Sequence, residues 1–242
     1  IGESALELKS GEYIYEEFKK FLTKNNLINE NWNGLNILVQ NASTVGLLDL
    51  KILQDKKEKS SSFFDDLKNR KFKLLYLLGS DNLEFQKNDE FIVYQGSHGD
   101  RGAEIADLIL PSATYTEQNG LYENLEGRIQ EGKKASYPIG EALEDWKIFN
   151  RIIKKLGFND KPANFDELRK EVLETVPNFS EVNELPKKSV IKTNSIETIF
   201  FSEKIFIREL DYYYTNSISR SSKTMSECRQ IRQKIKKDGT NN

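Results

Sequence analysis

The sequence has very few of the side chains that bind metals or form covalent cross-links. Its 242 residues include one cysteine, one histidine and one methionine. A single cysteine excludes an internal disulfide and an iron–sulfur cluster held by this chain alone, because such clusters normally need about four thiolates. One histidine argues in the same way against a zinc site built from histidine and cysteine. The sequence therefore favours no chemistry that depends on a resident metal.

Long apolar runs and a strong net charge are also missing. The longest apolar run, Leu74–Leu78, is far shorter than the roughly 20 residues that span a bilayer. The net charge of −2 gives no reason to expect a nucleic-acid partner. Positive charge gathers only in the segment Arg229–Lys237. We expect this basic segment to contact an acidic neighbouring subunit or to be solvated, in preference to binding anionic lipid or RNA.

The residues that are present suit a folded α/β protein. Apolar residues make up 37% of the chain, with 14 Phe and 10 Tyr to build a core, and charged residues make up 31%. Apolar strands are predicted at Phe72–Leu78, Phe91–Tyr94 and Asp107–Leu110, each soon followed by glycine or proline. Continuous apolar strands that alternate with helices are typical of a parallel sheet with both faces covered. The predicted fold class is therefore α/β, with a mainly parallel sheet covered by helices.

Three stretches repeat apolar residues at the spacing of an amphipathic helix. Ser10 is placed to cap the first, and Asn164 with Glu167 forms a capping pair for the third. Gly157 is placed to end the second. The apolar positions are Ile14, Phe18, Phe21 and Leu22 in the first stretch, Trp146, Phe149, Ile153 and Leu156 in the second, and Leu168 and Val172 in the third.

Two domains are predicted. Residues 1–185 form the α/β portion, and residues 186–242 form an extension with short strands at Thr198–Phe201 and Lys204–Ile207 and a basic terminal helix. One face of that helix would consist of Met225, Cys228, Ile231 and Ile235. At the other end, Ile1–Leu6 reads as the end of a strand and its glycine turn, with the strand itself missing. We therefore expect the chain to be the back part of something larger.

A glycine-rich segment, Gly96–Gly102, follows a predicted strand, as phosphate-binding loops do. Its spacing matches neither Gly-x-Gly-x-x-Gly nor the Walker loop, so a structural strand-to-helix turn is the default interpretation. His98 and Asp100 could form a general acid–base pair, although no nucleophile accompanies them. The structural interpretation is preferred for both features.

A second polar segment, Gly120–Gln130, concentrates charged and amide side chains between two glycines. These side chains are Glu123, Asn124, Glu126 and Arg128. They suggest either catalysis or a buried turn pinned by an arginine–carboxylate pair, which is at least as well supported. Cys228, with Arg229 and Arg232 nearby, is either a reactive thiol or, by preference, a quiet half-buried cysteine. No catalytic, cofactor-binding or metal-ligating residue is therefore predicted in this chain.

One stretch, Ala106–Gln130, resembles the signature of the molybdopterin oxidoreductase superfamily. That signature has Ala-Asp, an apolar triplet with proline, then Glu and Gly, then Asn-x-Glu-Gly-Arg-x-Gln, and each of these positions is kept. Three further segments, Val93–Ala103, Glu144–Ile148 and Asp211–Cys228, resemble the large iron–sulfur subunit of respiratory complex I, a branch that lost the pterin cofactor. The last is similar to the Ser-Ile-Ser-Arg-x-Ser-x-Thr-Met-x-x-Cys ending of the mitochondrial type. The resemblance extends, with gaps, through nearly the whole chain.

The resemblance implies a partial molybdopterin-oxidoreductase-like domain that is a structural, cofactor-free part of the complex I peripheral arm. In that family the complete subunit carries iron–sulfur clusters that relay electrons from NADH towards ubiquinone, and a partner subunit holds FMN. The cluster ligands lie in the amino-terminal part, which this chain lacks. Cys228 matches the terminal cysteine of the family and not a cluster ligand. No site residue can therefore be carried over.

The same resemblance implies the partners and the location. The partners are the cluster-bearing half of the subunit, on a separate chain or on one longer chain, and other peripheral-arm subunits. The implied location is the matrix side of the mitochondrial inner membrane, with no nucleic acid and no direct membrane span. The chain would then be part of an NADH:ubiquinone oxidoreductase without an active site of its own.

The alternative is a catalytic role. The superfamily signature also fits the carboxyl-terminal, cofactor-binding part of an active molybdopterin oxidoreductase, with Gly96–Gly102 and Asn124–Arg128 touching the cofactor. The complex I-like ending at Asp211–Cys228 argues against this alternative. An independent nucleotide-binding domain is disfavoured by the missing phosphate-loop spacing.

Overall fold

The computed structural model describes residues 1–52, 63–80, 86–158, 162–176, 179, 181–184, 196–205 and 211–239. The chain divides into two compact units, each assembled from three separate segments. The hairpin unit consists of Ile1–Asp55, Gly120–Gly132 and Ala163–Ile207, and the sheet unit of Lys56–Asn119, Lys133–Pro162 and Arg208–Asn242. The predicted domain boundary between residues 185 and 186 lies outside the described residues and stays a prediction.

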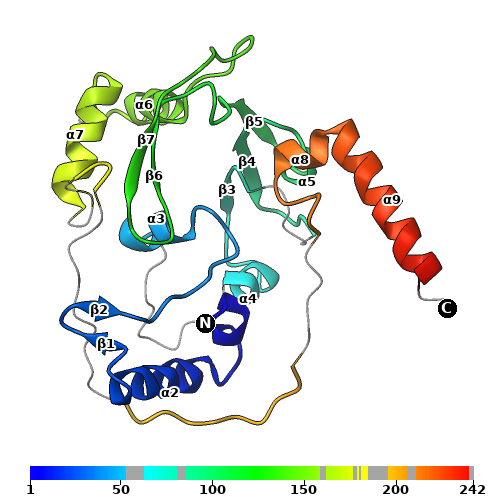
Figure 1. Ribbon diagram of the computed structural model, residues 1–242. Coiled ribbons are helices and arrows are strands. Elements are labelled where there is room, and N and C mark those ends of the chain that lie inside the picture. Colours follow the sequence, from blue (N-terminus) through cyan, green and yellow to red (C-terminus); the bar gives the residue numbers. More distant parts are fainter. Residues whose placement is uncertain are drawn as a thin grey trace. The chain divides into compact units, whose positions relative to one another are not determined.

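The sheet unit contains a parallel sheet of three strands in the order β3-β4-β5 (Figure 1). Its strands are β3 (Leu74–Leu78), β4 (Phe91–Gly96) and β5 (Leu108–Pro111). In the register of the sheet, Leu75 lies opposite Ile92, and Tyr94 lies opposite Ile109. The strands lie at the three predicted apolar runs. The predicted α/β class with a parallel sheet is therefore confirmed.

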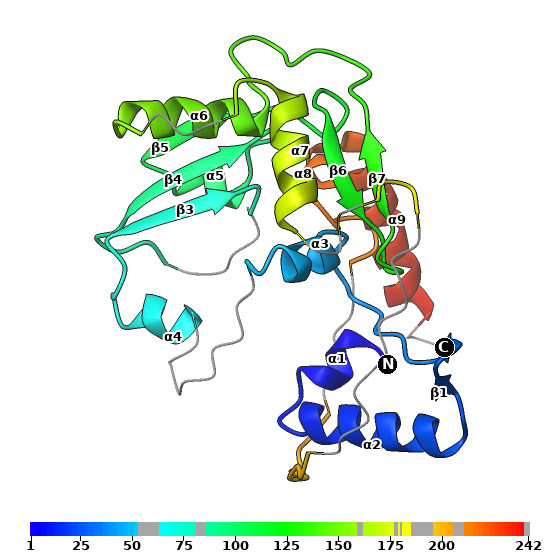
Figure 2. The ribbon, with the colours of Figure 1, turned by 90° about the vertical axis from the view of Figure 1, so that its left-hand side faces the viewer.

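Helices pack against both faces of this sheet, in keeping with its mainly apolar strands, although Leu78, Leu108 and Ile109 remain exposed. The covering helices are α4 (Phe63–Lys68), α5 (Arg101–Glu104) and α6 (Asp145–Lys155). On one face the strands form a buried core with Leu67 of α4, and Ala103 of α5 packs against it. The strand residues of this core are Leu75, Leu77, Ile92 and Tyr94. On the other face, Tyr76 stacks on Phe149 of α6, and Figure 2 shows α6 beside β5.

The predicted second helix is α6, and it ends as predicted at a glycine. Gly157 has a φ of +86°, a left-handed conformation that glycine adopts without steric cost. Ile148 is the buried residue of the helix, with 6% of its surface exposed. The predicted apolar stripe includes Leu156, but this residue is exposed because the helix ends at Lys155 and Leu156 lies in the C-cap.

The hairpin unit is built around the antiparallel strands β6 (Gly120–Glu123) and β7 (Ile129–Gly132). Ile129 is fully buried and clusters with Val176 and Phe179, and Leu173 of α7 (Phe165–Thr175) packs against this cluster. The remaining elements of the unit are α1 (Glu3–Leu6), α2 (Gly11–Lys24), β1 (Ile28–Asn29), β2 (Trp32–Asn33) and α3 (Thr44–Asp49).

The predicted capping pair of α7 is confirmed. The Oδ1 atom of Asn164 accepts a hydrogen bond from the backbone N–H of Glu167 at 2.9 Å. The Oε2 atom of Glu167 in turn accepts from the backbone N–H of Ala163 at 2.8 Å. Two backbone donors at the start of the helix are thereby satisfied by one short sequence pattern.

The predicted cap of α2 is wrong, although the helix itself is confirmed. Ser10 occupies the N-cap position but makes no side-chain cap bond. Its hydroxyl instead donates to the carbonyl of Phe201 and accepts from the N–H of Phe201, both at 2.8 Å. The residues that α2 buries include Glu16 and Lys19, joined at 2.6 Å, while Phe18 and Phe21 of the predicted stripe are exposed.

The short strands predicted at Thr198–Phe201 and Lys204–Ile207 are also wrong within the described residues. Residues 196–205 contain no strand, and residues 206 and 207 lie outside the described part. The backbone of Phe201 pairs with the Ser10 side chain, so it has no strand partner at that position. The basic terminal helix is confirmed as α9 (Lys223–Gly239), preceded by α8 (Ser217–Ser221). Over the described residues, no helix combines the length and apolar character needed to cross a bilayer.

Candidate functional site

The glycine-rich segment Gly96–Gly102 leads from β4 to α5, as the structural interpretation predicted. Tyr94 is 1% exposed, and its hydroxyl donates to the carbonyl of His98 at 2.6 Å. The imidazole Nδ1 of His98 lies 3.0 Å from the Ser97 hydroxyl. A Cβ atom on Gly96 would overlap the Tyr94 ring, so the glycine is required by the packing of the strand end.

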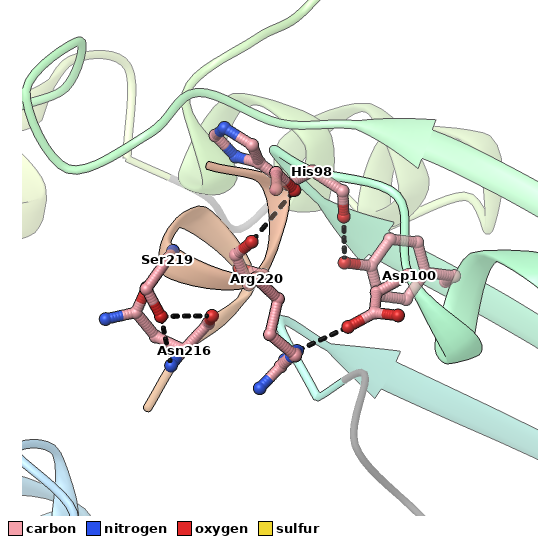
Figure 3. Close-up of polar contacts among 8 residues, drawn as sticks. His98, Asp100, Asn216, Ser219 and Arg220 are labelled. Atoms are coloured by element: carbon pink, nitrogen blue, oxygen red, sulfur yellow. Dashed lines mark hydrogen bonds and ion pairs between the residues drawn. The ribbon is translucent and has the colours of Figure 1, made fainter. Parts of the chain in front are cut away.

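His98 and Asp100 have different partners, so the structure does not join them as an acid–base pair. The Asp100 carboxylate forms an ion pair with Arg220 of α8, which comes from the complex I-like ending of the chain (Figure 3). Asn216 and Ser219 form a capping box at the start of α8. Arg220 was not singled out as a site residue, because nothing in the local sequence reveals a partner 120 positions away.

A buried polar network links β4 to α6. The side chain of Gln95 is fully buried, and its Nε2 atom donates to Asp145 at 2.6 Å. Gln118 donates to the other oxygen of Asp145 at 2.9 Å, and its own Oε1 atom accepts from the Asp145 N–H. The Tyr76 hydroxyl donates to Gln95, and burial, aided by the Asp145 charge, raises the pKa of Tyr76. Sequence reasoning missed this network because its members lie far apart in the chain.

The buried carboxylate of Glu144, just before α6, organises a second polar cluster. Its carboxylate accepts from the Trp146 indole at 2.7 Å and pairs with Lys147 at 3.2 Å and Lys134 at 3.3 Å. Burial alone would raise the pKa of Glu144, but the hydrogen bonds from Trp146 and Lys147 outweigh burial and lower it. Glu144 therefore remains ionised and ties the segment around Lys134 to α6.

The second polar segment, Gly120–Gln130, forms the β6–β7 hairpin and its turn. Asn124 Oδ1 accepts from the backbone N–H groups of Glu126 and Arg128, both at 3.0 Å. The Arg128 guanidinium donates to the carbonyl of Asn183 at 3.2 Å. The turn is therefore closed by an amide, and the arginine of the expected arginine–carboxylate pair bonds a backbone carbonyl instead.

Glu123, in the same segment, faces another carboxyl group. Its Oε2 atom is buried without a hydrogen-bond partner among the described residues. Burial, a hydrogen bond with Asp49 of α3 and the charge of Asp49 raise the Glu123 pKa to about 7. Glu123 is therefore partly protonated near neutral pH. Across the described residues, no group of three or more His, Cys, Asp or Glu side chains is placed to hold a metal ion.

Cys228 is half-buried on α9, as preferred from the sequence. Its neighbour Arg229 forms an ion pair with Asp211 and lies 4.6 Å from the ring centre of Tyr214. Arg232 lies 5.9 Å from the ring centre of Tyr213. These arginines contact acidic and aromatic groups, so the described contacts give no support to a reactive thiol.

Two family models match this chain. The molybdopterin oxidoreductase model matches residues 1–155. The model of the C-terminal domain of the G-type subunit of NADH-ubiquinone oxidoreductase matches residues 181–228. The first match contains the glycine-rich segment and the β6–β7 hairpin. The second contains α8 and Arg220.

Named relatives agree with these matches. The NADH-ubiquinone oxidoreductase 75 kDa subunit of Reclinomonas americana is 37% identical over 236 residues, covering 96% of this chain and 33% of the relative. The mitochondrial NADH-ubiquinone oxidoreductase 78 kDa subunit of Candida albicans is 35% identical, covering 94% of this chain and 32% of the relative. The 78 kDa subunit of Neurospora crassa, which carries the same name, is also 35% identical, covering 94% and 31%.

The chain thus spans about a third of the length of these relatives. The superfamily signature and the complex I-like ending both fall inside matched regions. The sequence resemblance is therefore confirmed. Because the first model covers more than half of the chain and the second adds the characteristic ending, the chain belongs to the molybdopterin oxidoreductase family, in the branch formed by the 75 and 78 kDa subunits of NADH-ubiquinone oxidoreductase.

Proposed function

We propose that this chain is a structural, cofactor-free part of the large iron–sulfur subunit in the peripheral arm of complex I, where it supports electron transfer from NADH to ubiquinone. One observation carries the proposal: two polar side chains of the family signature, Asn124 and Arg128, and Asp100 in the segment before it are already bound within the chain. Asn124 closes its own turn, Arg128 donates to the Asn183 carbonyl, and Asp100 is paired with Arg220. These residues therefore do not fit a pterin site, and no catalytic step is derived from them.

The redox groups of the assembly would then lie outside this chain. A single cysteine cannot hold an iron–sulfur cluster, so the clusters belong in this proposal to the cluster-bearing half of the subunit. FMN would be held by a partner subunit. In this proposal the chain itself has no catalytic, cofactor-binding or metal-binding residue and contributes packing surface to an NADH:ubiquinone oxidoreductase.

The proposed partners are that cluster-bearing half, possibly a separate chain, and other peripheral-arm subunits on the matrix side of the mitochondrial inner membrane. Support comes from the relatives, which are named as subunits and in two cases as mitochondrial. Two exposed aromatic residues on α2, Phe18 and Phe21, provide apolar surface of the kind that partners cover.

The alternative is the cofactor-binding part of an active molybdopterin oxidoreductase. It is favoured by the molybdopterin oxidoreductase match over residues 1–155. The internal pairing of Asn124, Arg128 and Asp100 counts against it, because an active site needs such groups available for the ligand.

Native-gel separation of detergent-solubilised mitochondrial membranes tests the proposal. Each band would be stained for NADH oxidation, analysed for molybdenum and searched for peptides of this chain. We expect the chain in the large NADH-oxidising band, together with peptides that carry the cluster ligands. The intact mass of the chain would then show whether the cluster-bearing half is a separate polypeptide. Migration in a smaller band that contains molybdenum would overturn the structural role and favour the alternative.

A further inference from the structure

The carboxyl ends of β4 and β5 meet at the edge where α/β sheets usually bind ligands. The loops after these strands line a cavity of about 500 Å³. Ser97, His98 and Ser112 contribute polar groups to its wall, and Ile218 of α8 contributes an apolar group. A short helix from the far end of the sequence therefore takes part in the wall of this edge.

An ion pair fixes α8 at this position. Arg220 Nε donates to Asp100 Oδ2, and the two side chains are only 18% and 27% exposed. The first turn of α8 is closed by its capping box: Asn216 Oδ1 accepts from the Ser219 N–H at 2.9 Å, and the Ser219 hydroxyl accepts from the Asn216 N–H at 3.1 Å. Figure 3 shows Arg220 extending from this turn to Asp100. The guanidinium is thereby held beside the loop that follows β4.

The Asp100 side chain makes this contact instead of capping its own helix. It is the N-cap residue of α5, a position at which aspartate normally accepts a hydrogen bond from its own helix. The Asp100 side chain makes no such bond and pairs with Arg220. The rest of the loop is held by the bond from the Tyr94 hydroxyl to the His98 carbonyl. The loop is therefore shaped to receive α8.

We propose that α8 takes the place of a bound ligand at this sheet edge, and that the Arg220–Asp100 ion pair holds α8 there. A phosphate-bearing ligand at this edge would need a cation, and the cation supplied by α8 is already paired with Asp100. Ile218 lines the adjoining wall. This inference rests on the proposed cofactor-free function and identifies the segment that closes the edge.

Hydrogen–deuterium exchange of the full chain, followed by mass spectrometry, tests this inference. The variant is Arg220→Gln, and the matched control is Arg229→Gln, which breaks the more exposed pair with Asp211. We expect exchange in residues 97–102 and 112–117 to become roughly five-fold faster in Arg220→Gln and to stay unchanged in the control. Faster exchange confined to α8, with both loops unchanged, would overturn the inference, because the pair would then anchor α8 without closing the edge.

A chemical probe gives a second readout. His98 is the sole histidine of the chain and lines the cavity, so its reaction with diethyl pyrocarbonate reports access to the edge. We expect a several-fold faster reaction in Arg220→Gln and in Asp100→Asn, which serves if the first variant does not fold. Equal rates in both variants and in the unchanged chain would refute closure. Both measurements use the full chain by itself, so they can fail or succeed independently of the native-gel test of complex I membership.

Discussion

At the scale of single residues, carboxyl groups organise much of the polar interior. Glu144 is buried, but it has an indole and two ammonium groups around it, and its pKa is lowered despite the opposing effect of burial. Glu123 is also sheltered, but it faces Asp49, and burial together with that carboxyl group raises its pKa. The two glutamates therefore differ in charge at neutral pH: Glu144 is ionised, whereas Glu123 retains a proton about half of the time.

Glu123→Gln should remove a pH dependence of stability. The Glu123 pKa is about 7 in the folded chain, against an ordinary 4.5, so the folded state binds the extra proton between these values. The stability contribution is full below about pH 4.5 and is lost as pH rises through about 7. With allowance for solvent screening, we expect the native chain to lose on the order of 2 kcal/mol over this window, and the Gln variant to lose much less. Urea unfolding at pH 5, 6, 7 and 8 measures the difference.

The control for this prediction is Glu126→Gln in the same turn, where the side chain is exposed. This control should unfold like the unchanged chain at every pH. If the free energy of unfolding changes with pH in the same way in the native chain and in Glu123→Gln, then Glu123 does not hold the proton.

Gly96→Ala should destabilise the sheet unit. The new methyl group would overlap the ring of Tyr94, which is buried and bonded to His98, so it cannot move aside freely. We expect a loss of about 1–3 kcal/mol. Gly99→Ala in the same loop is the matched control, because its Cβ would meet Ala103 at an ordinary 3.6 Å. Urea unfolding followed by Trp146 fluorescence in a Trp32→Phe background reports the sheet unit alone, and equal midpoints for the two variants would contradict the packing argument.

At the scale of elements, the sequence predicted what local patterns determine. Continuous apolar runs located β3, β4 and β5 because a doubly covered parallel strand is apolar on both faces. The Asn164–Glu167 pattern located the start of α7 because the two side chains accept hydrogen bonds from nearby backbone N–H groups at the helix start. The cap predicted at Ser10 was wrong because a serine hydroxyl can also bond a distant backbone, and Phe201 provides one. The Glu123–Asp49 and Arg220–Asp100 pairs were missed because tertiary folding alone brings them together.

Asn164→Ala should weaken α7 and the hairpin unit that it supports. The change removes the cap bond to the Glu167 N–H, and α7 carries Val172 and Leu173, which pack against the cluster containing Ile129. We expect a loss of about 1 kcal/mol in the free energy of unfolding, measured by urea titration with circular dichroism.

Lys170→Ala in the same helix provides the comparison. Its ion pair with Glu174 spans 3.8 Å and both side chains are exposed, so the loss should stay within a few tenths of a kcal/mol. If the two variants lose the same stability, the capping bond has no special role in α7.

At the scale of the whole molecule, the order of the segments along the chain differs from their grouping into the two compact units. Each compact unit takes segments from both halves of the sequence, and the β6–β7 hairpin falls between two segments of the sheet unit. Local patterns carry no information on such interleaving, because they describe neighbours along the chain. The family matches do not follow the spatial grouping either: residues 181–228 match a domain of their own, yet α8 from this region belongs to the sheet unit.

Truncation of the carboxyl end should separate the roles of α9 and α8. Removing residues 223–242 deletes α9, whose described contacts include an ion pair with Asp211, ring contacts with Tyr213 and Tyr214, and packing on α8. We expect the melting temperature of the sheet unit to fall by less than about 2 °C. Removing residues 208–242 also deletes Ile218 and Arg220, so the fall should exceed about 5 °C.

The two truncations can be compared through one fluorophore, because Trp146 is the sheet unit's single tryptophan and Trp32 lies in the hairpin unit. In a Trp32→Phe background, thermal melting of Trp146 fluorescence reports the unit that α8 is expected to hold together. Equal losses for both truncations would mean that α9, and not α8, stabilises this part of the chain. A large loss only for the longer truncation would assign the stabilisation to residues 208–222, which place Ile218 and Arg220 against the loop that contains Asp100.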